Sequence, residues 1–110
     1  MKLPNLEKAT IAPAKLLDYL LSDTHAHGRH KAAFFKRFGF SRDDWATLRA
    51  ELFRHASIHE VSRVESSPFG MRYIIDGTLV TPDGRNPRIR AVWFVENGAD
   101  IPRIVTAFPL

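Results

Sequence analysis

The 110-residue sequence contains no cysteine, and none of its hydrophobic runs approaches the roughly 20 residues that a membrane-spanning helix needs. Without cysteine the fold can use neither disulfide bonds nor thiolate metal sites, although this does not indicate a redox compartment. Residues 1–7 also lack the long apolar segment of a secretory signal. We therefore expect a soluble, cytoplasmic protein that does not contact a membrane.

The motifs of several familiar enzyme classes are missing too. The sequence has no serine nucleophile elbow, no glycine-rich phosphate loop and no dinucleotide-binding fingerprint. It also has no internal repeat and no low-complexity segment. Its length predicts a single domain over residues 1–110, and 45% apolar residues are enough for one modest core.

Positive charge exceeds negative charge. The formal net charge is +4 and the isoelectric point is about 9.9. Such a balance favours an anionic partner, for example a nucleic acid or an acidic protein. A basic surface without special function would give the same values, so the positions of the charges along the chain carry more information.

The sequence predicts a first helix after Pro13. Proline suits the first turn of a helix because it has no amide hydrogen to leave unsatisfied there. The helix is expected to end near Ser22. Its buried stripe consists of leucines at helical spacing, namely Leu16, Leu17, Leu20 and Leu21.

A second helix is expected between Gly28 and Gly39, whose missing side chain suits a left-handed helix end. At helical spacing His30, Phe34 and Phe38 share one column, with Phe35 beside them. The opposite side carries cations, which are Arg29, Lys36 and Arg37. This helix can therefore bury a phenylalanine stripe and expose a basic face.

A third helix is expected from Ser41 to about His55. Ser41 resembles an N-cap residue, and Asp44 follows three positions later as in a capping box. Phe40 and Trp45 have the spacing of a hydrophobic staple, which would fix the angle between the second and third helices.

From Ile58 onward the hydrophobic period becomes alternating, as is typical of strands. Pro82, Asp83 and Gly84 predict a tight turn. Strands are expected near 58–66, 71–81, 87–96 and 103–108. Short connections favour an antiparallel meander, so the predicted fold class is α+β, with three N-terminal helices on one face of a four-stranded sheet.

Arginines are expected on the open face of this sheet. If Trp93 and its alternating neighbours face the helices, Arg72, Arg88 and Arg90 must lie on the other side. There they can hold phosphate oxygens. The alternative is that acidic residues neutralise them as cross-strand pairs, the candidates being Glu60, Asp76 and Glu96. For the last strand, periodicity leaves open which residues face the helices.

His25, His27 and His30 have a spacing that can chelate a metal ion, but no carboxylate is fixed nearby in the sequence, so no metal site is expected. Two further histidines, His55 and His59, flank a helix-to-strand junction and are expected at the surface.

His30 and Lys31 are the first candidates for chemistry. Imidazole exchanges protons near neutral pH, and the aromatic column would hold His30 in place. A structural His30, hydrogen-bonded at the helix start, is the alternative. Lys31 lies in the first helical turn, where free amide hydrogens also attract anions.

Nearly the whole chain resembles a small uncharacterised bacterial family of stand-alone proteins of about this length. The family is similar in layout to the toxin ribonucleases of the barnase, EndoU, colicin and RelE group. The residues that carry the resemblance are Lys2-Leu3-Pro4-Asn5, Lys15-Leu16-x-x-Tyr19-Leu20-Leu21, Gly28-Arg29-His30-Lys31-Ala32-x-Phe34-Phe35, Gly39-Phe40, Tyr73, Pro82-Asp83-Gly84-Arg85, Val92-Trp93 and Pro102 to Pro109.

The resemblance implies an endoribonuclease that uses no metal and no other cofactor, in which the ribose 2′-hydroxyl attacks the adjacent phosphate. It also implies an antitoxin protein encoded nearby. The implied catalytic residues are His30, Lys31, Arg90 and Thr106, and the implied substrate-binding residues are His27, Arg72, Arg88 and Arg103. Phe108 stands where related sequences favour tyrosine, which removes a phenolic group.

Two interpretations compete with this one. The same basic face would serve a non-catalytic module that binds an acidic protein or a nucleic acid, and a structural or accessory role would make the histidines incidental. The ribonuclease hypothesis requires the first turn of the second helix and the cationic side of the C-terminal strands to meet at one groove.

Overall fold

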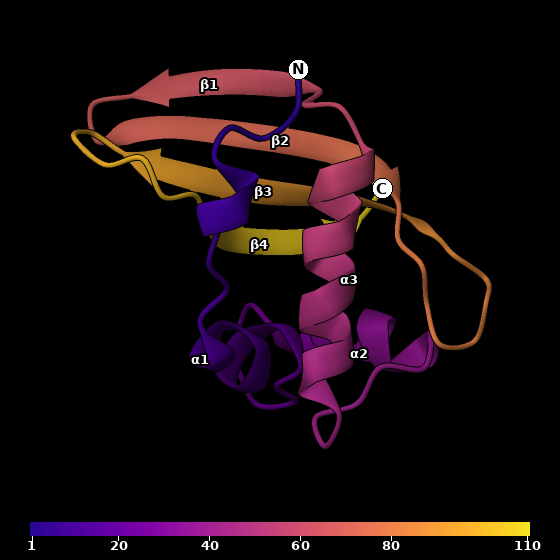
Figure 1. Ribbon diagram of the computed structural model, residues 1–110. Helices are drawn as coiled ribbons and strands as arrows, with labels where there is room; N and C mark the ends of the chain where they lie inside the picture. Colours follow the sequence, from indigo (N-terminus) through magenta and orange to yellow (C-terminus); the bar gives the residue numbers. More distant parts are fainter.

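The computed structural model describes all residues, 1–110, and it confirms the predicted α+β fold. Its four strands form one antiparallel sheet in the order β1-β2-β3-β4. Helix α3 crosses one face of this sheet, and the shorter helices gather near β4 (Figure 1). The elements are η1 (Leu6–Lys8), α1 (Pro13–Lys15), η2 (Leu16–Leu20), α2 (Arg29–Arg37), α3 (Trp45–Ile58), β1 (Arg63–Ser67), β2 (Gly70–Thr78), β3 (Arg88–Glu96) and β4 (Arg103–Pro109).

The hydrophobic core lies between α3 and the sheet. Trp93 in β3 is fully buried, and Leu48 and Leu52 of α3 are buried as well. The ring of Phe53 lies 6.0 Å from that of Trp93. The open face of the sheet is the opposite one, as the alternating pattern of β2 and β3 predicted.

The first predicted helix is interrupted by a wide turn. Pro13 occupies its first turn, as predicted, but η2 is a π-turn in which the Leu21 amide donates to the Leu16 carbonyl at 2.8 Å. The helix ends at Leu20 rather than near Ser22. The wide turn changes which side chains share a face, so Leu17 is only half-buried and the predicted four-leucine stripe is wrong at this position.

Helix α2 ends as its glycine predicted. Gly39 has a φ of +104°, and its amide donates to the Lys36 carbonyl while the Phe40 amide donates to the Phe35 carbonyl. These two bonds form a Schellman motif that satisfies the last carbonyls of the helix.

The buried face of α2 differs from the predicted phenylalanine column. Ala32 and Phe35 are fully buried, whereas Phe34 and Phe38 are half-buried and His30 is exposed. The column therefore lies at the margin of the core, and it leaves the His30 ring in contact with solvent.

Helix α3 begins later and ends later than predicted. The Ser41 hydroxyl does accept a hydrogen bond from the Asp44 amide at 3.2 Å, but helical structure begins only at Trp45 with Asp44 as its N-cap. Because α3 continues to Ile58, the first strand begins at Arg63 and not at residue 58.

Strand β4 contains an irregularity that decides which residues face the helices. Its register against β3 shifts between Val92 and Trp93. As a result Ile104 and Ala107 both pack in the core, and Thr106 lies opposite Val92 on the open side. Neither of the two alternating sets in the sequence faces the helices along the whole strand.

His55 is buried, which contradicts the expected surface position. Only 1% of it is exposed; its Nε2 lies 3.1 Å from the Gly77 carbonyl oxygen, and its Nδ1 has no partner. The ring of His59 lies 4.7 Å away. Burial is the main cause that lowers the pKa of His55 to about 4.

This burial predicts a loss of stability in mild acid. Because the pKa of His55 is lowered from 6.5 to about 4 in the folded state, the unfolded chain binds a proton more readily, and stability falls as pH decreases through this window. The total loss is about 3 kcal/mol. In chemical denaturation at several pH values, His55→Met should show a flatter profile than wild type, whereas His27→Asn should not; equal slopes for wild type and His55→Met would contradict the assignment.

Candidate functional site

Three elements meet at a small polar cluster beside β4. The Lys31 Nζ donates to the Tyr19 Oη at 2.5 Å, and the Tyr19 Oη lies 3.1 Å from the Thr106 Oγ1. Tyr19 comes from η2, Lys31 from the first turns of α2 and Thr106 from β4. The predicted pair Lys31 and Thr106 is thus brought together, with Tyr19 as the link between them.

Gly28 allows this approach. A Cβ at Gly28 would lie 2.2 Å from the Tyr19 carbonyl oxygen, which no real side chain tolerates. Helix α2 therefore begins directly against the backbone of η2. This contact places the Lys31 Nζ 4.9 Å from the centre of the Tyr19 ring.

The Tyr19 ring lies among cations. The Lys15 Nζ is 5.0 Å from its centre, and the His25 ring packs against it edge-on at 4.9 Å. Partial burial acts to raise the pKa of the Tyr19 phenol, but the hydrogen bonds with Lys31 and Thr106 and the charges of Lys31 and Lys15 outweigh it, so the pKa is lowered from 10. The cluster thus favours negative charge on the phenol oxygen.

A shallow pocket of about 460 Å³ opens next to this cluster. It is lined by His30, Lys31, Phe108 and Pro109. The Lys31 Nζ lies 5.8 Å from the centre of the Phe108 ring. The first turn of α2 and the end of β4 therefore form one concave surface. The ribonuclease hypothesis required a groove shared with the sheet arginines, and none of these arginines lines the pocket.

The arginines of the open sheet face are mostly neutralised. Arg90 is held by Asp76 on the neighbouring strand, with Nε–Oδ1 at 2.8 Å and Nη2–Oδ2 at 2.9 Å. The hydrogen bond from Arg90 also lowers the pKa of Asp76. Arg72 pairs with Glu65. The alternative of cross-strand neutralisation therefore describes this face better than an open phosphate cradle.

The end of the sheet near Arg103 shows the same pattern. Arg103 pairs with Glu96 at 3.4 Å, and its guanidinium lies over the Phe94 ring. Glu60, the third acidic residue expected to neutralise the sheet, instead contacts the N-terminal amine and Lys2. Arg103 is therefore not part of the Tyr19 cluster.

Some of the cations have no carboxylate partner, and two of these lie beside Tyr19. Nine of the sixteen Lys and Arg side chains form an ion pair with a carboxylate. The seven without one are Lys15, Arg29, Lys31, Arg37, Arg49, Arg54 and Arg88. Of these, Lys15 and Lys31 flank Tyr19, and Arg29 begins α2. Positive charge without a protein counter-ion thus lies at the cluster.

Arg88 is the one sheet arginine in this unpaired group. Its carbonyl accepts a hydrogen bond from the Leu110 amide, and the neighbouring Ile89 pairs with Pro109, which lines the pocket. Arg88 is therefore beside the end of β4 that borders the candidate site.

The three clustered histidines do not converge on one point. His25 uses its Nδ1 to accept hydrogen bonds from the backbone amides of His27 and Gly28, at 3.0 and 2.9 Å. No group of three histidine or carboxylate side chains is placed to hold a metal ion. His27 is exposed, and its ring lies 6.0 Å from that of His25 rather than in the pocket.

Sequence reasoning missed Tyr19. It appeared only among the residues that carry the family resemblance, and its partner Thr106 is 87 positions away. The available signal was the spacing of Lys15 and Tyr19, which places a cation one helical turn before a phenol.

Comparison with known proteins places the chain in a family. A family model described as a domain of unknown function (DUF6883) matches residues 2–110. The chain belongs to this family. No curated protein matches the DUF6883 chain, and none of its helices is long and apolar enough to cross a membrane.

One solved structure that shares the DUF6883 fold is a contact-dependent growth inhibition toxin - immunity protein complex from Klebsiella pneumoniae 342. The similar chain has a TM-score of 0.71 and 17% sequence identity, and the match covers 93% of this chain and 100% of that chain. At this identity the likeness establishes a shared fold. The predicted membership of a small uncharacterised family is confirmed, and the ribonuclease group stays a prediction.

The cluster makes a prediction about the ionisation of Tyr19. In Lys31→Met the phenol loses a hydrogen bond and a positive charge while it stays partly buried, so its pKa should rise relative to wild type. Ultraviolet titration of the phenolate in a Tyr73→Phe background would isolate Tyr19. Lys36→Met, on the same helix, should leave the titration unchanged, and an unchanged pKa in Lys31→Met would refute the contact.

Proposed function

We propose that this DUF6883 domain is a toxin-like ribonuclease that cleaves RNA without a metal ion and is neutralised by a partner protein. The observation that carries the proposal is the cluster of Lys31, Tyr19 and Thr106 beside His30, where two lysines without a carboxylate partner lie close to the Tyr19 ring. The resemblance to toxin ribonucleases and the geometry of this cluster support it independently.

A phosphate group would find compensating charge at this position. Lys15 and Lys31 are within 5.0 Å of the Tyr19 ring centre, and no carboxylate is paired with either one. Arg29 and Arg88 provide further cations for flanking phosphates. A phosphodiester that enters the pocket therefore does not have to displace an existing ion pair.

The proposed reaction requires one proton acceptor and one proton donor. The ribose 2′-oxygen forms a bond to phosphorus, and the bond from phosphorus to the 5′-oxygen breaks, which leaves a cyclic phosphate and a 5′-hydroxyl. His30 accepts the proton of the 2′-hydroxyl. Tyr19 gives its proton to the departing 5′-oxygen, and Lys31 stabilises the phenolate that remains.

Thr106 and Lys31 would orient the phosphate during this step. The Thr106 hydroxyl is fixed by the Tyr19 Oη, and the Lys31 ammonium can also neutralise charge on the phosphorane oxygens. Arg90, Arg72 and Arg103 already have carboxylate partners. In this reaction they would act at most on distant phosphates, together with exposed His27.

The comparison of folds supports the proposal of a partner protein. The similar chain comes from a complex of a growth inhibition toxin and its immunity protein. A cytoplasmic nuclease would need such an inhibitor to spare the cell that makes it. The same unpaired cations would also suit a non-catalytic module that binds an acidic protein or a nucleic acid, and catalysis distinguishes the two.

Cleavage of RNA by the purified chain tests the proposal. We expect cleavage in the presence of a chelator, with cyclic phosphate ends, and a loss of at least about 100-fold in His30→Ala, Lys31→Met and Tyr19→Phe. Lys36→Met keeps the activity because Lys36 is paired with Asp23 away from the cluster. A folded chain that leaves all RNA intact would refute the enzyme, and RNA binding without cleavage would support the binding module.

The pattern of neutralised charge predicts which residues RNA contacts. Lys15→Met should weaken binding of 2′-O-methyl RNA, which cannot be cleaved, and should reduce the slope of log affinity against log salt by about 0.7. Removing the neutral pair in the double variant Asp76→Asn, Arg90→Met should leave both unchanged. Fluorescence anisotropy over a salt series measures the affinity and the slope. If the double variant weakened binding and Lys15→Met did not, the RNA would bind on the open sheet face instead.

A further inference from the structure

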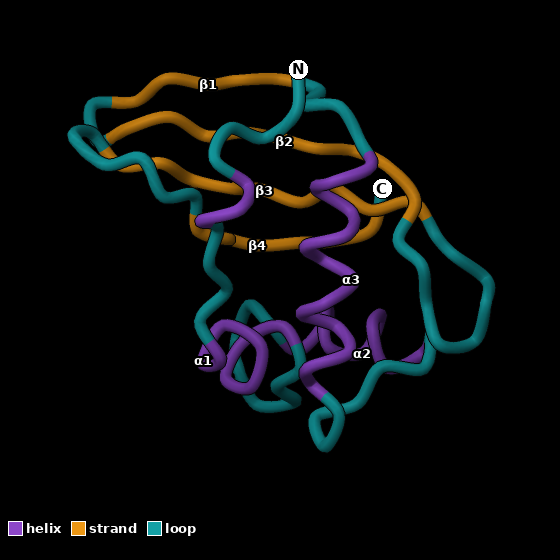
Figure 2. The backbone as a smooth tube through the Cα atoms, in the orientation of Figure 1, coloured by secondary structure: helices purple, strands orange, loops and turns teal.

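The loop between β2 and β3 folds back and contacts the C-terminal end of α2 (Figures 1 and 2). The loop and the helix end are in contact through a backbone hydrogen bond, through close packing and through Arg85. The Asp83 amide donates to the Phe38 carbonyl at 3.3 Å. A Cβ on Gly39 would lie 3.0 Å from the Pro82 Cβ, so the loop packs directly against the helix end.

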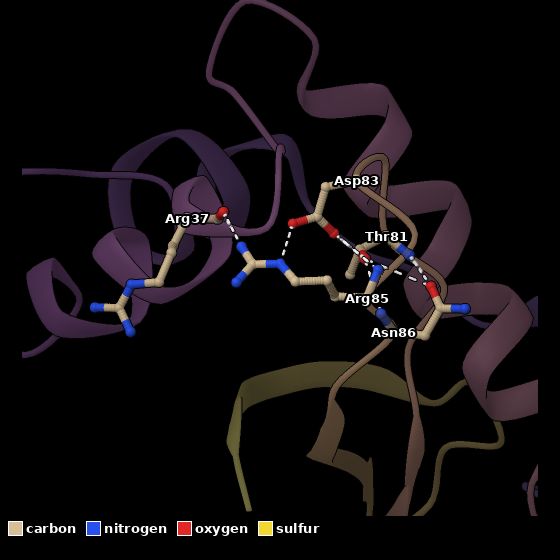
Figure 3. A network of polar contacts seen from close by, with 5 residues as sticks. All are labelled: Arg37, Thr81, Asp83, Arg85 and Asn86. Atoms are coloured by element: carbon tan, nitrogen blue, oxygen red, sulfur yellow. Dashed lines mark hydrogen bonds and ion pairs between the residues drawn. The ribbon is translucent and has the colours of Figure 1, made fainter.

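Arg85 also contacts this end of the helix, as Figure 3 shows. Its Nη2 donates to the Arg37 carbonyl at 2.7 Å, and its guanidinium lies 4.3 Å from the centre of the Phe38 ring. The Schellman bonds use the carbonyls of Phe35 and Lys36. The next two carbonyls, of Arg37 and Phe38, accept their hydrogen bonds from Arg85 and Asp83 of the loop.

The loop holds Arg85 in this orientation. The Arg85 Nε donates to the Asp83 Oδ2 at 2.5 Å, and the Asp83 Oδ1 accepts from the Thr81 hydroxyl at 2.8 Å and from the Arg85 amide at 3.0 Å. Asn86 closes the loop by accepting from the Thr81 amide at 2.9 Å. Figure 3 shows Thr81, Asp83 and Asn86 grouped within the loop, while the Arg85 guanidinium reaches the Arg37 carbonyl.

The other end of α2 carries Lys31. Lys31 lies six positions before Arg37, which is about 9 Å along the helix axis. The N-terminal end has no side-chain cap and rests on the Tyr19 backbone through Gly28. The Gly28 contact and the loop contacts therefore hold opposite ends of the same nine-residue helix.

We propose that Arg85 is a positioning residue, which fixes the C-terminal end of α2 against the β2–β3 loop and thereby sets where Lys31 lies relative to Tyr19 and Thr106. Arg85 touches none of these three residues. For catalysis this role rests on the proposed ribonuclease function, but the position of Lys31 can be measured without RNA.

Titration of the Tyr19 phenol reports the position of Lys31. In a Tyr73→Phe background, Arg85→Ala should raise the pKa of Tyr19 above that of wild type, in the same direction as Lys31→Met. Arg85→Lys keeps the charge but loses the paired contacts to the Arg37 carbonyl and Asp83, so it should give a smaller rise. It also supplies a second measurement if Arg85→Ala folds poorly.

Arg63→Ala is the matched control. Arg63 is an exposed arginine paired with a carboxylate two residues away, as Arg85 is, but it lies on β1. The pKa of Tyr19 in Arg63→Ala should equal that in wild type. If the Arg85 variants melt at lower temperature and yet titrate as wild type does, Arg85 is only a stabilising residue and the positioning role is wrong.

RNA cleavage gives a separate readout. If the chain cleaves RNA, Arg85→Ala should lower kcat roughly tenfold or more with little change in KM, whereas equal kcat values would refute the catalytic part. If the chain cleaves no RNA, the proposed function fails, and the phenol titration still decides whether Arg85 positions α2.

Discussion

The close contact between Gly28 and the carbonyl of Tyr19 is the constraint on which the candidate site depends. No other residue type fits there, since a Cβ would lie 2.2 Å from the oxygen. The contact brings the start of α2 onto η2, and the wide turn of η2 lets the phenol of Tyr19 reach the Thr106 hydroxyl of the edge strand. Backbone geometry thus brings together a lysine, a phenol and a hydroxyl from distant parts of the chain.

The two kinds of positive charge in this molecule have different consequences. On the sheet, strand pairing places Asp76 directly opposite Arg90. Their charges cancel, and the pair links β2 to β3. Near Tyr19, lysines approach an aromatic ring from two elements without a carboxylate. A net charge of +4 is therefore less informative than the location of cations that have no partner.

Local patterns in the sequence were sufficient for the fold, and non-local contacts explain what was missed. Alternation and the turn at residues 82–84 predicted the meander, and Gly39 predicted the end of α2, because each depends on neighbours in the chain. The wide turn of η2, the late start of α3 and the burial of His55 depend on packing against distant elements. For the site, His30 and Lys31 could be found from residue type, whereas the role of Tyr19 required the register and irregularity of β4.

The two edge strands of the sheet, β1 and β4, differ in what surrounds them, and this affects how the protein behaves in concentrated solution. Along β4 the neighbouring α2 hinders access to the edge. Strand β1 is only five residues long and places Arg63 and Glu65 at its free edge. Short, charged edges disfavour the addition of a further strand from another molecule. This edge therefore disfavours the open-ended addition of strands from one molecule to the next, which would build fibres.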